Sequence, residues 1–211
     1  MKLQLALDDL SMKQSIELLY KVEKYIDIIE IGTPFMMIEG MKATREIKKR
    51  FPDHELLCDT KIMDAGAFEA QIAFDAGADY LTVLGITDNN TIMACIEKAR
   101  EYDRKVVVDM ICVPNLKQRI KTLEDIGVEY FAVHTGVDQH ANGRTPLDDL
   151  IEMKEATTKA KIAVAGGLNS NNLDLYMPYA PDIIIVGGGI LNAPDPVKET
   201  KMIKLIINAI A

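Results

Sequence analysis

The sequence predicts an α/β protein with one domain over residues 1–211, a (β/α)8 barrel of parallel strands. Short β-rich runs alternate with amphipathic segments along the whole chain, at a spacing of about 25 residues and without a low-complexity linker. Alternating strands and helices require parallel strands, and eight such units without a break in composition indicate a closed barrel. A doubly wound open sheet is the alternative. It does not need eight units, and the Gly-x-Gly-x-x-Gly turn is missing after the first run.

Eight runs rich in aliphatic and β-branched residues are the expected strands. They span residues 3–8, 26–32, 55–61, 79–85, 105–111, 129–136, 161–167 and 182–189.

The helices are predicted from apolar residues at spacings of three and four. In residues 11–25, Ile16, Leu19 and Tyr20 share one face, and Ser11 is suited to cap the start. Further segments follow the same pattern at 44–51, 68–77, 90–102, 116–127 and 197–210. Gly77 and Gly127 stand where helices of this kind end.

Composition narrows the functional class. The chain has 48% hydrophobic residues, enough for one well-packed core, and no run long enough to cross a membrane. Its formal net charge of −8 argues against a nucleic-acid partner, whereas a small anion is still possible because backbone amides can bind it. The start lacks the features of a signal peptide, and three unpaired cysteines fit a reducing compartment, so we expect a cytoplasmic protein.

Charged and polar residues stand where the predicted strands end. They are Asp8, Glu30, Asp59, Lys61, Asp109 and His134. Any one of them alone reads best as a solvated turn residue. Six at the same end of six nearly aliphatic runs indicate a site, because the catalytic groups of such barrels stand at the C-terminal ends of the strands.

Side-chain alternation groups these residues further. Asp59 and Lys61 are two positions apart and therefore point to the same side, toward the barrel interior. Neighbouring carboxylates favour the charged form of Lys61, which suits stabilising an oxyanion better than forming a Schiff base. Glu30 and Asp59 offer hard oxygen ligands for Mg²⁺. The structural alternative is an internal network of salt bridges.

Two glycine clusters follow the last two strands. Gly166 and Gly167 end the seventh, and Gly187, Gly188 and Gly189 end the eighth. Loops at these two places commonly bind phosphate in barrels, because glycine lets backbone amides approach the anion. We therefore expect a phosphorylated substrate. Of the histidines, His134 is the one placed to act as a general acid or base.

Several motifs together resemble one family. The stretches are "LQLALD", "IEIGTP", "DTKIMDAG", "VDMI", "HTGVDQ", "AVAGG" and "IIVGGGI". The chain resembles the 3-hexulose-6-phosphate synthase family of the orotidine 5'-monophosphate decarboxylase superfamily over essentially its whole length. The resemblance implies that Lys61 is the active-site lysine and Asp59 its partner. It also implies a homodimer in which Asp64 reaches the neighbouring subunit's site.

The related 3-keto-L-gulonate 6-phosphate decarboxylases share the barrel, the Mg²⁺ and an enediolate intermediate. Members of that family typically carry glutamate, arginine and threonine where this chain has Asp109, Val137 and Ala165. They also tend to carry arginine at the position of Gly188. These four differences favour the synthase.

The resemblance therefore implies a reversible aldol addition of D-ribulose 5-phosphate to formaldehyde, giving D-arabino-hex-3-ulose 6-phosphate. His134 would remove the C1 proton, Lys61 would stabilise the enediolate, and Asp8 would orient Lys61 or a substrate hydroxyl. Asp109 is expected among the substrate-binding residues. The decarboxylase, a Schiff-base aldolase using Lys61 and a catalytically inactive metabolite sensor remain the alternatives.

Overall fold

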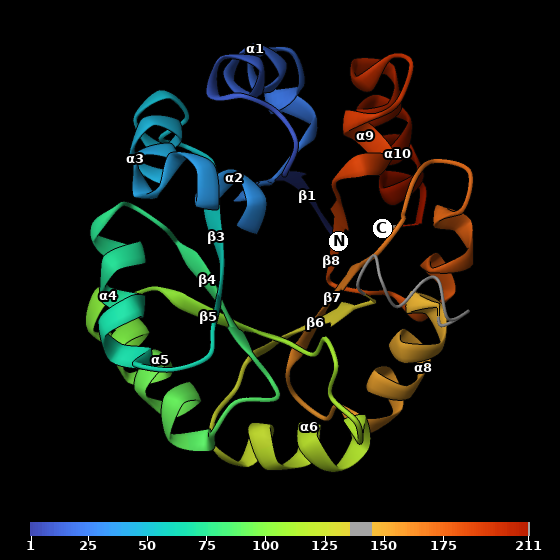
Figure 1. Ribbon diagram of the computed structural model, residues 1–211. Coiled ribbons are helices and arrows are strands. Elements are labelled where there is room, and N and C mark those ends of the chain that lie inside the picture. Colours follow the sequence, from blue (N-terminus) through green and yellow to red (C-terminus); the bar gives the residue numbers. More distant parts are fainter. Residues whose placement is uncertain (136–144, 211) are drawn as a thin grey trace.

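The computed structural model describes residues 1–135 and 145–210 and shows one closed barrel of parallel strands in chain order (Figure 1). The strands are β1 (Lys2–Leu7), β2 (Ile28–Ile31), β3 (Glu55–Ile62), β4 (Tyr80–Leu84), β5 (Lys105–Asp109), β6 (Tyr130–His134), β7 (Lys161–Ala165) and β8 (Ile183–Val186). Pairing of β1 with β8 closes the ring. The (β/α)8 barrel is thus confirmed, and all eight predicted strands are present.

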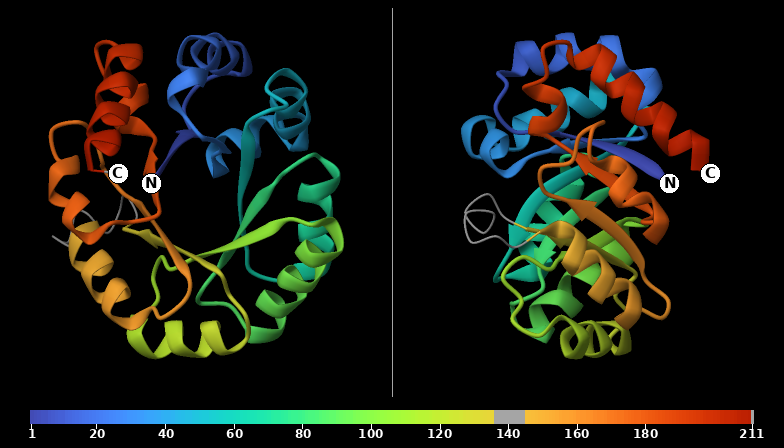
Figure 2. Two further views of the ribbon diagram at one scale, coloured as in Figure 1. Left: turned by 180° about the vertical axis from the view of Figure 1, so that it is seen from behind. Right: turned by 90° about the vertical axis from the view of Figure 1, so that its right-hand side faces the viewer.

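Helices surround the barrel, as both views of Figure 2 show. They are α1 (Met12–Val22), α2 (Thr33–Glu39), α3 (Met41–Arg50), α4 (Gly66–Asp75), α5 (Asn89–Tyr102), α6 (Leu116–Asp125), α8 (Pro146–Ala156), α9 (Gly188–Leu191) and α10 (Pro196–Ile210). Three 3₁₀ turns, η1 (Glu23–Tyr25), η2 (Leu173–Leu175) and η3 (Met177–Tyr179), complete the described elements. None of the helices in these described ranges is long and apolar enough to span a membrane.

The residues predicted to start or end helices do so in the structure. Ser11 caps α1 in a capping box with Gln14. Gly77 and Gly127 follow α4 and α6 with φ of 101° and 93°, a conformation that glycine adopts without strain. One unit departs from the expected strand-then-helix pattern, because η2 and η3 replace a full helix between β7 and β8. Pro178 lies in that segment, and proline interrupts a regular helix by removing a backbone donor.

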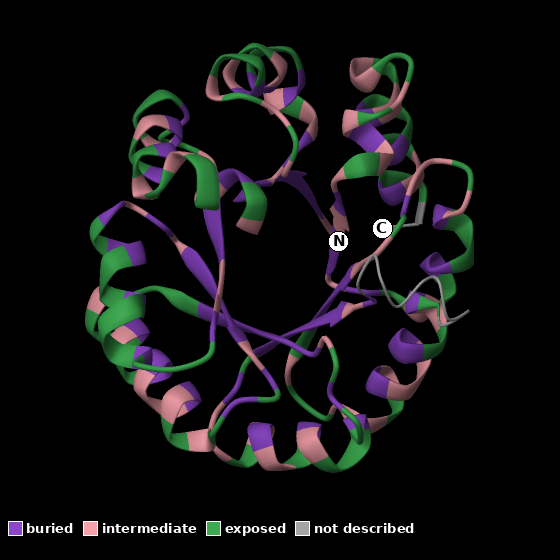
Figure 3. Cartoon of the chain, viewed as in Figure 1, coloured by how far each residue is buried: buried purple, intermediate pink, exposed green. Residues whose placement is uncertain are grey.

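The core has two layers, and burial is concentrated on the strands and on the inner helix faces (Figure 3). The larger layer lies between strands and helices. The smaller one fills the barrel near its N-terminal end, where Tyr80 and Tyr130 pack edge to face with ring centroids 5.8 Å apart. Apolar side chains therefore plug one end of the barrel. The opposite end is left for polar groups.

Aspartates help to fix the strand register. Asp27, Asp79 and Asp182 each directly precede a strand, namely β2, β4 and β8. Each accepts a hydrogen bond of 2.8–2.9 Å from the backbone N–H of the second residue of the preceding strand. A charged acceptor on a backbone donor is stronger than a neutral one. These contacts hold neighbouring strands at the relative height that brings their C-terminal ends together.

Candidate active site

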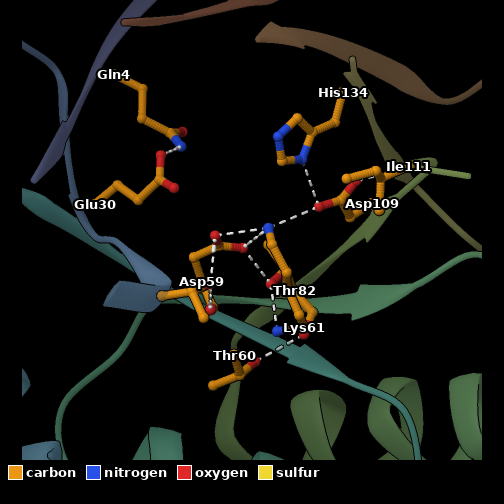
Figure 4. Close-up of polar contacts among 10 residues, drawn as sticks. Gln4, Glu30, Asp59, Thr60, Lys61, Thr82, Asp109, Ile111 and His134 are labelled. Atoms are coloured by element: carbon orange, nitrogen blue, oxygen red, sulfur yellow. Dashed lines mark hydrogen bonds and ion pairs between the residues drawn. The ribbon is translucent and has the colours of Figure 1, made fainter. Parts of the chain in front are cut away.

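Side chains from six strands converge at the C-terminal end of the barrel (Figure 4). The close-up shows Gln4 of β1, Glu30 of β2, Asp59, Thr60 and Lys61 of β3, Thr82 of β4, Asp109 of β5 and His134 of β6. Five of the six predicted strand-end residues are in this group. On each strand, these side chains point to the same side as the apolar residues that fill the N-terminal end of the barrel. Those residues include Ile28, Leu57, Tyr80, Val107 and Tyr130.

Lys61 lies at the centre of the polar group. Its Nζ donates to both oxygens of Asp59, at 2.9 and 2.7 Å, and to Asp109 Oδ2 at 2.9 Å. Asp59 and Lys61 thus share one side of β3, as alternation predicted. The backbone there is nevertheless irregular: pairing with β4 shifts between Cys58 and Ile62, and Lys61 has φ of 47°.

The surroundings of Lys61 keep it charged. Burial alone would lower the pKa of the ammonium, but the negative charges of Asp59 and Asp109 outweigh it and raise the pKa above its ordinary value. A protonated lysine is a poor nucleophile. The geometry therefore favours oxyanion stabilisation over a Schiff base.

Asp109 joins Lys61 to His134. It is 2% exposed, and its Oδ2 also accepts from His134 Nδ1 at 2.9 Å, while its Oδ1 accepts from the Ile111 backbone N–H. Burial would raise the pKa of this carboxyl, but the hydrogen bond and charge of His134 and the charge of Lys61 lower it to about 2. An ionised carboxylate only accepts hydrogen bonds, so Nδ1 carries the proton. In the neutral imidazole, the other ring nitrogen is then free to accept one.

Asp59 is held by side chains from α2, β3 and β4. Thr33, the first residue of α2, donates to Asp59 Oδ2 at 2.8 Å and is 2.7 Å from its backbone oxygen. Thr82 of β4 donates to Asp59 Oδ1 at 2.8 Å. With the two contacts from Lys61, the carboxylate accepts hydrogen bonds at both oxygens. Its orientation is therefore set by three different elements.

Glu30 is a buried carboxyl beside Asp59. Burial and the charge of Asp59 raise its pKa to about 8, against the lowering effect of a 2.6 Å hydrogen bond from Gln4 Nε2. The Oε1 atom of Gln4 is buried without a partner. A divalent cation would remove the cost of burying the Glu30 charge beside another carboxylate.

The oxygen donors here fit Mg²⁺. Within residues 1–135 and 145–210 there is no cluster of three or more acidic, histidine or cysteine side chains that could hold a metal. Mg²⁺ does not need one, because it binds through one or two carboxylates and completes its shell with waters and substrate oxygens. Glu30 and Asp59 meet that requirement. The residues present fit the ion, while its binding stays a prediction.

Asp8 follows β1 and lies near the polar group without a hydrogen bond to Lys61 among the described residues. Burial and the charge of Asp59 raise its pKa, but Lys61 donates to Asp59 and Asp109 rather than to Asp8. It lies instead against the glycines after β2 and β8: a Cβ on Gly32 would stand 2.0 Å from its Oδ1, and one on Gly187 would stand 3.0 Å from its Oδ2. Among the described residues no hydrogen bond joins Lys61 to Asp8, although the charge of Lys61 acts on the Asp8 carboxyl, and orientation of Lys61 by Asp8 stays a prediction. Contact with a substrate hydroxyl remains a prediction.

The predicted phosphate loops pack against each other. Gly166 and Gly167 have φ of 120° and 66°, and the short helix α9 begins at Gly188. A Cβ on Gly189 would come within 2.0 Å of the Leu168 backbone oxygen, so only glycine permits this approach of the two loops. The five glycines are brought together at the mouth of the barrel, and phosphate binding by them stays a prediction.

Asp64 is separated from this group. Its side chain is exposed and accepts a hydrogen bond from its own neighbour, the Ala65 backbone N–H. The predicted difference at Val137 lies outside the described residues. Sequence reasoning missed Gln4, Thr33 and Thr82, although Gln4 and Thr82 had a signal, since each is a polar residue at an inward-facing position of an otherwise apolar strand.

A closed barrel with a lysine, a histidine and carboxylates at its strand ends is the arrangement of a (β/α)8-barrel enzyme. The chain belongs to the Orotidine 5'-phosphate decarboxylase / HUMPS family, whose profile matches residues 1–203.

Relatives within this family are similar over nearly the whole chain. A 3-hexulose-6-phosphate synthase of Bacillus subtilis (strain 168) is 44% identical over 207 residues, covering 98% of this chain and 99% of that protein. The crystal structure of 3-hexulose-6-phosphate synthase from Salmonella typhimurium matches with a TM-score of 0.98 at 50% identity, covering all of both chains. The 3-keto-L-gulonate-6-phosphate decarboxylase from Vibrio cholerae O1 biovar El Tor matches with a TM-score of 0.85 at 26% identity, covering 100% of this chain and 98% of that one. The relatives therefore support an aldol-type synthase more strongly than a decarboxylase.

Proposed function

We propose that the chain catalyses the reversible aldol addition of D-ribulose 5-phosphate to formaldehyde, giving D-arabino-hex-3-ulose 6-phosphate. One observation carries the chemistry. A charged lysine and a histidine share the buried carboxylate of Asp109, so a proton acceptor and an oxyanion stabiliser stand side by side. The identity of the substrates is inferred from the 3-hexulose-6-phosphate synthases that this chain resembles over nearly its whole length.

The proton steps centre on His134. Because Asp109 holds the Nδ1 proton, Nε2 takes the proton from C1 of the ketose, and the electrons of that C–H bond form the enediolate. C1 then attacks the formaldehyde carbon, and a new C–C bond forms as the C=O π bond opens. The former formaldehyde oxygen takes the proton from His134. The histidine thereby returns to its starting form, and the reverse sequence releases formaldehyde.

Lys61 stabilises the charge that develops between these steps. Its ammonium is fixed by Asp59 and Asp109 before substrate arrives, so it needs little reorganisation when the enediolate oxygen becomes negative. Such preorganised donors act most strongly away from water. The side chain of Lys61 is 24% exposed, so it is partly shielded from solvent and still open to the substrate.

The proposal includes Mg²⁺ as cofactor. Glu30 and Asp59 would hold the ion, which supplies Lewis-acid polarisation of substrate oxygens when bound. Asp59 already accepts hydrogen bonds from Lys61, Thr33 and Thr82, so at least one of these contacts has to lengthen to free an oxygen lone pair. Gln4 keeps its contact with Glu30 Oε2, which leaves Oε1 of Glu30 open.

Glycines 166, 167, 187, 188 and 189 are proposed to bind the substrate phosphate. They lie after β7 and β8, where barrels of this fold commonly bind phosphate through backbone amides. Asp8, placed against Gly187, is the adjacent side chain suited to a sugar hydroxyl.

We also propose a homodimer in which Asp64 serves the partner's site. Exposed apolar side chains lie close to this residue in the chain: Met63, Phe68 and Ile72 are 53%, 68% and 39% exposed. Ile86 is 48% exposed on the loop after β4, where the Thr87 hydroxyl donates to the Met63 backbone oxygen. Burying such a patch favours association. Phe68→Asp should therefore yield monomers in sedimentation velocity and lower activity, whereas Leu175→Asp, another exposed apolar position, should leave the dimer intact. A dimer that survives Phe68→Asp would contradict this interface.

The second candidate is decarboxylation of 3-keto-L-gulonate 6-phosphate. The similarity to the Vibrio cholerae decarboxylase favours it, although at 26% identity against 50% for the Salmonella synthase. Asp109, Ala165 and Gly188 differ from the residues expected there. Parallel assays separate the two functions: hexulose phosphate formed from ribulose 5-phosphate and formaldehyde supports the synthase, and CO₂ release from the keto-gulonate phosphate supports the decarboxylase.

A cytoplasmic location is part of the same proposal. The three cysteines are free, and burial raises the pKa of Cys58 and Cys95 to about 12, so these two thiols are unreactive. Free thiols of this kind are typical of a reducing compartment.

A further inference from the structure

Thr82 occupies an unusual place between Lys61 and Asp59 (Figure 4). It lies in the middle of β4, is 5% exposed and faces the barrel interior. Its Oγ1 accepts a hydrogen bond of 2.9 Å from the Lys61 backbone N–H and lies 2.8 Å from Asp59 Oδ1. A hydroxyl has one proton, and the backbone N–H can only donate. The threonine proton is therefore committed to the Asp59 carboxylate.

The backbone of Lys61 needs this support. Its φ of 47° is in the left-handed region, which residues with a side chain adopt when their surroundings hold them there. The regular pairing of β3 with β4 is also interrupted between Cys58 and Ile62. Within that interruption the Thr82 hydroxyl accepts a hydrogen bond from the Lys61 backbone N–H. A second hydrogen bond joins the two strands there, because Thr60 Oγ1 donates to the Thr82 backbone oxygen at 2.7 Å.

We propose that Thr82 is a positioning residue for the reaction. Its hydroxyl fixes the Lys61 backbone relative to the Asp59 carboxylate, and this fixes the direction from which the ammonium reaches both Asp59 and Asp109. A serine or threonine hydroxyl can accept from the one group while donating to the other through a single oxygen atom, whereas valine and alanine can do neither. The catalytic consequence rests on the proposed function of Lys61, whereas the positioning itself is a property of the fold.

Two pairs of variants test the kinetic consequence. Thr82→Val keeps the shape and removes the hydroxyl, while Thr82→Ser keeps the hydroxyl and removes the methyl group. Loss of hydrogen bonds to charged or strained groups predicts a kcat for Thr82→Val about 10- to 100-fold below wild type, with KM for ribulose 5-phosphate changed by less than about threefold. Thr82→Ser should stay within about threefold of wild type in kcat. Thr82→Ala against Thr82→Ser gives the same comparison without the methyl group, should the valine variant not fold.

Thr200→Val is the matched control. Thr200 is fully buried in α10, and its hydroxyl donates to the Pro196 backbone oxygen, far along the chain from the site. Its replacement removes a buried hydroxyl hydrogen bond and should leave kcat unchanged. Equal losses of kcat in Thr82→Ala and Thr82→Ser, or wild-type kcat in Thr82→Ala, would overturn the proposal.

Amide hydrogen exchange tests the positioning without any activity. In the wild type and in Thr82→Ser, the Lys61 backbone N–H should be protected, because the hydroxyl holds it. In Thr82→Ala it should exchange at least about tenfold faster, while the amides of β7 keep their wild-type rates. Unchanged protection of Lys61 in Thr82→Ala would show that the hydroxyl does not hold it. A wild type inactive as a synthase but with this exchange pattern would refute the proposed reaction and leave the positioning intact.

Discussion

Replacement of Asp109 by asparagine tests how closely the charge of one buried carboxylate is tied to catalysis. Its Oδ2 accepts from Lys61 and His134, and its Oδ1 accepts from the Ile111 backbone N–H. Asparagine has the same shape but only one acceptor oxygen. If that oxygen faces Lys61 and His134, the amide NH₂ faces the Ile111 N–H. If the amide is turned over, its NH₂ faces the ammonium and the ring. Either orientation sets donor against donor.

The size of the effect follows from these contacts. A hydrogen bond to a charged group contributes about 1.5–3 kcal/mol, and Asp109→Asn removes or weakens the two that hold Lys61 and His134. A loss of about 3–5 kcal/mol in the transition state corresponds to a decrease of about 10²–10⁴ in kcat. The histidine would also lose the acceptor that selects its Nδ1–H tautomer, which places this change toward the upper part of the range.

Steady-state kinetics with ribulose 5-phosphate and formaldehyde measure this loss, and thermal melts show whether the variant is folded. Asp125→Asn is the matched control, since Asp125 is exposed on the last turn of α6, and it should keep wild-type kcat. A folded Asp109→Asn variant with kcat within about tenfold of wild type would refute the role of this carboxylate in coupling the two groups.

Three further predictions concern the lysine, the buried glutamate and the strand register. Lys61→Ala should lose about 10²–10³ in kcat, and borohydride should trap no covalent adduct between wild type and ribulose 5-phosphate; near-full activity or a trapped adduct would contradict oxyanion stabilisation. Glu30 has a folded-state pKa of about 8 against an ordinary value of 4.5, so the folded chain binds the extra proton between these values. The free energy of unfolding in EDTA should therefore fall by a few kcal/mol as the pH rises from 5 to 8. Urea titrations should show this slope in wild type and little of it in Glu30→Gln, and equal slopes would count against the burial argument. Asp182→Ala should lower the free energy of unfolding by about 1–3 kcal/mol because the Ile162 N–H loses its acceptor, whereas Asp125→Ala should change it by less than about 0.5 kcal/mol; equal effects would exclude a register role.

The fold was predictable because its signal is repeated. Each strand is a short aliphatic run, and the interior parity of Asp59 and Lys61 follows from alternation even though the backbone at Lys61 is irregular. What the pattern could not give was the segment between β7 and β8, where η2 and η3 replace a helix. Single-turn elements carry too few residues for a periodic signal.

The site was predictable in its members and less so in its contacts. Strand ends identified the charged residues, but which carboxylate binds Lys61 depends on strand spacing and register. Asp8 at the end of β1 was a reasonable partner by position, yet the hydrogen bond of Lys61 to another strand goes to Asp109 of β5. Gln4 and Thr82 were overlooked because an uncharged polar residue inside a strand gives no sign of a functional role in the sequence. Their roles become visible only from their hydrogen bonds to Glu30 and Lys61.

The central claim is tested most directly by formaldehyde consumption in the presence of ribulose 5-phosphate, measured with Mg²⁺ and again with excess EDTA. The proposed reaction predicts loss of formaldehyde that requires both the sugar phosphate and the metal, with equal amounts of hexulose phosphate formed. Consumption that continues in EDTA would contradict the role of Glu30 and Asp59 as metal ligands. No consumption under either condition would contradict the synthase itself and make 3-keto-L-gulonate 6-phosphate the next substrate to assay.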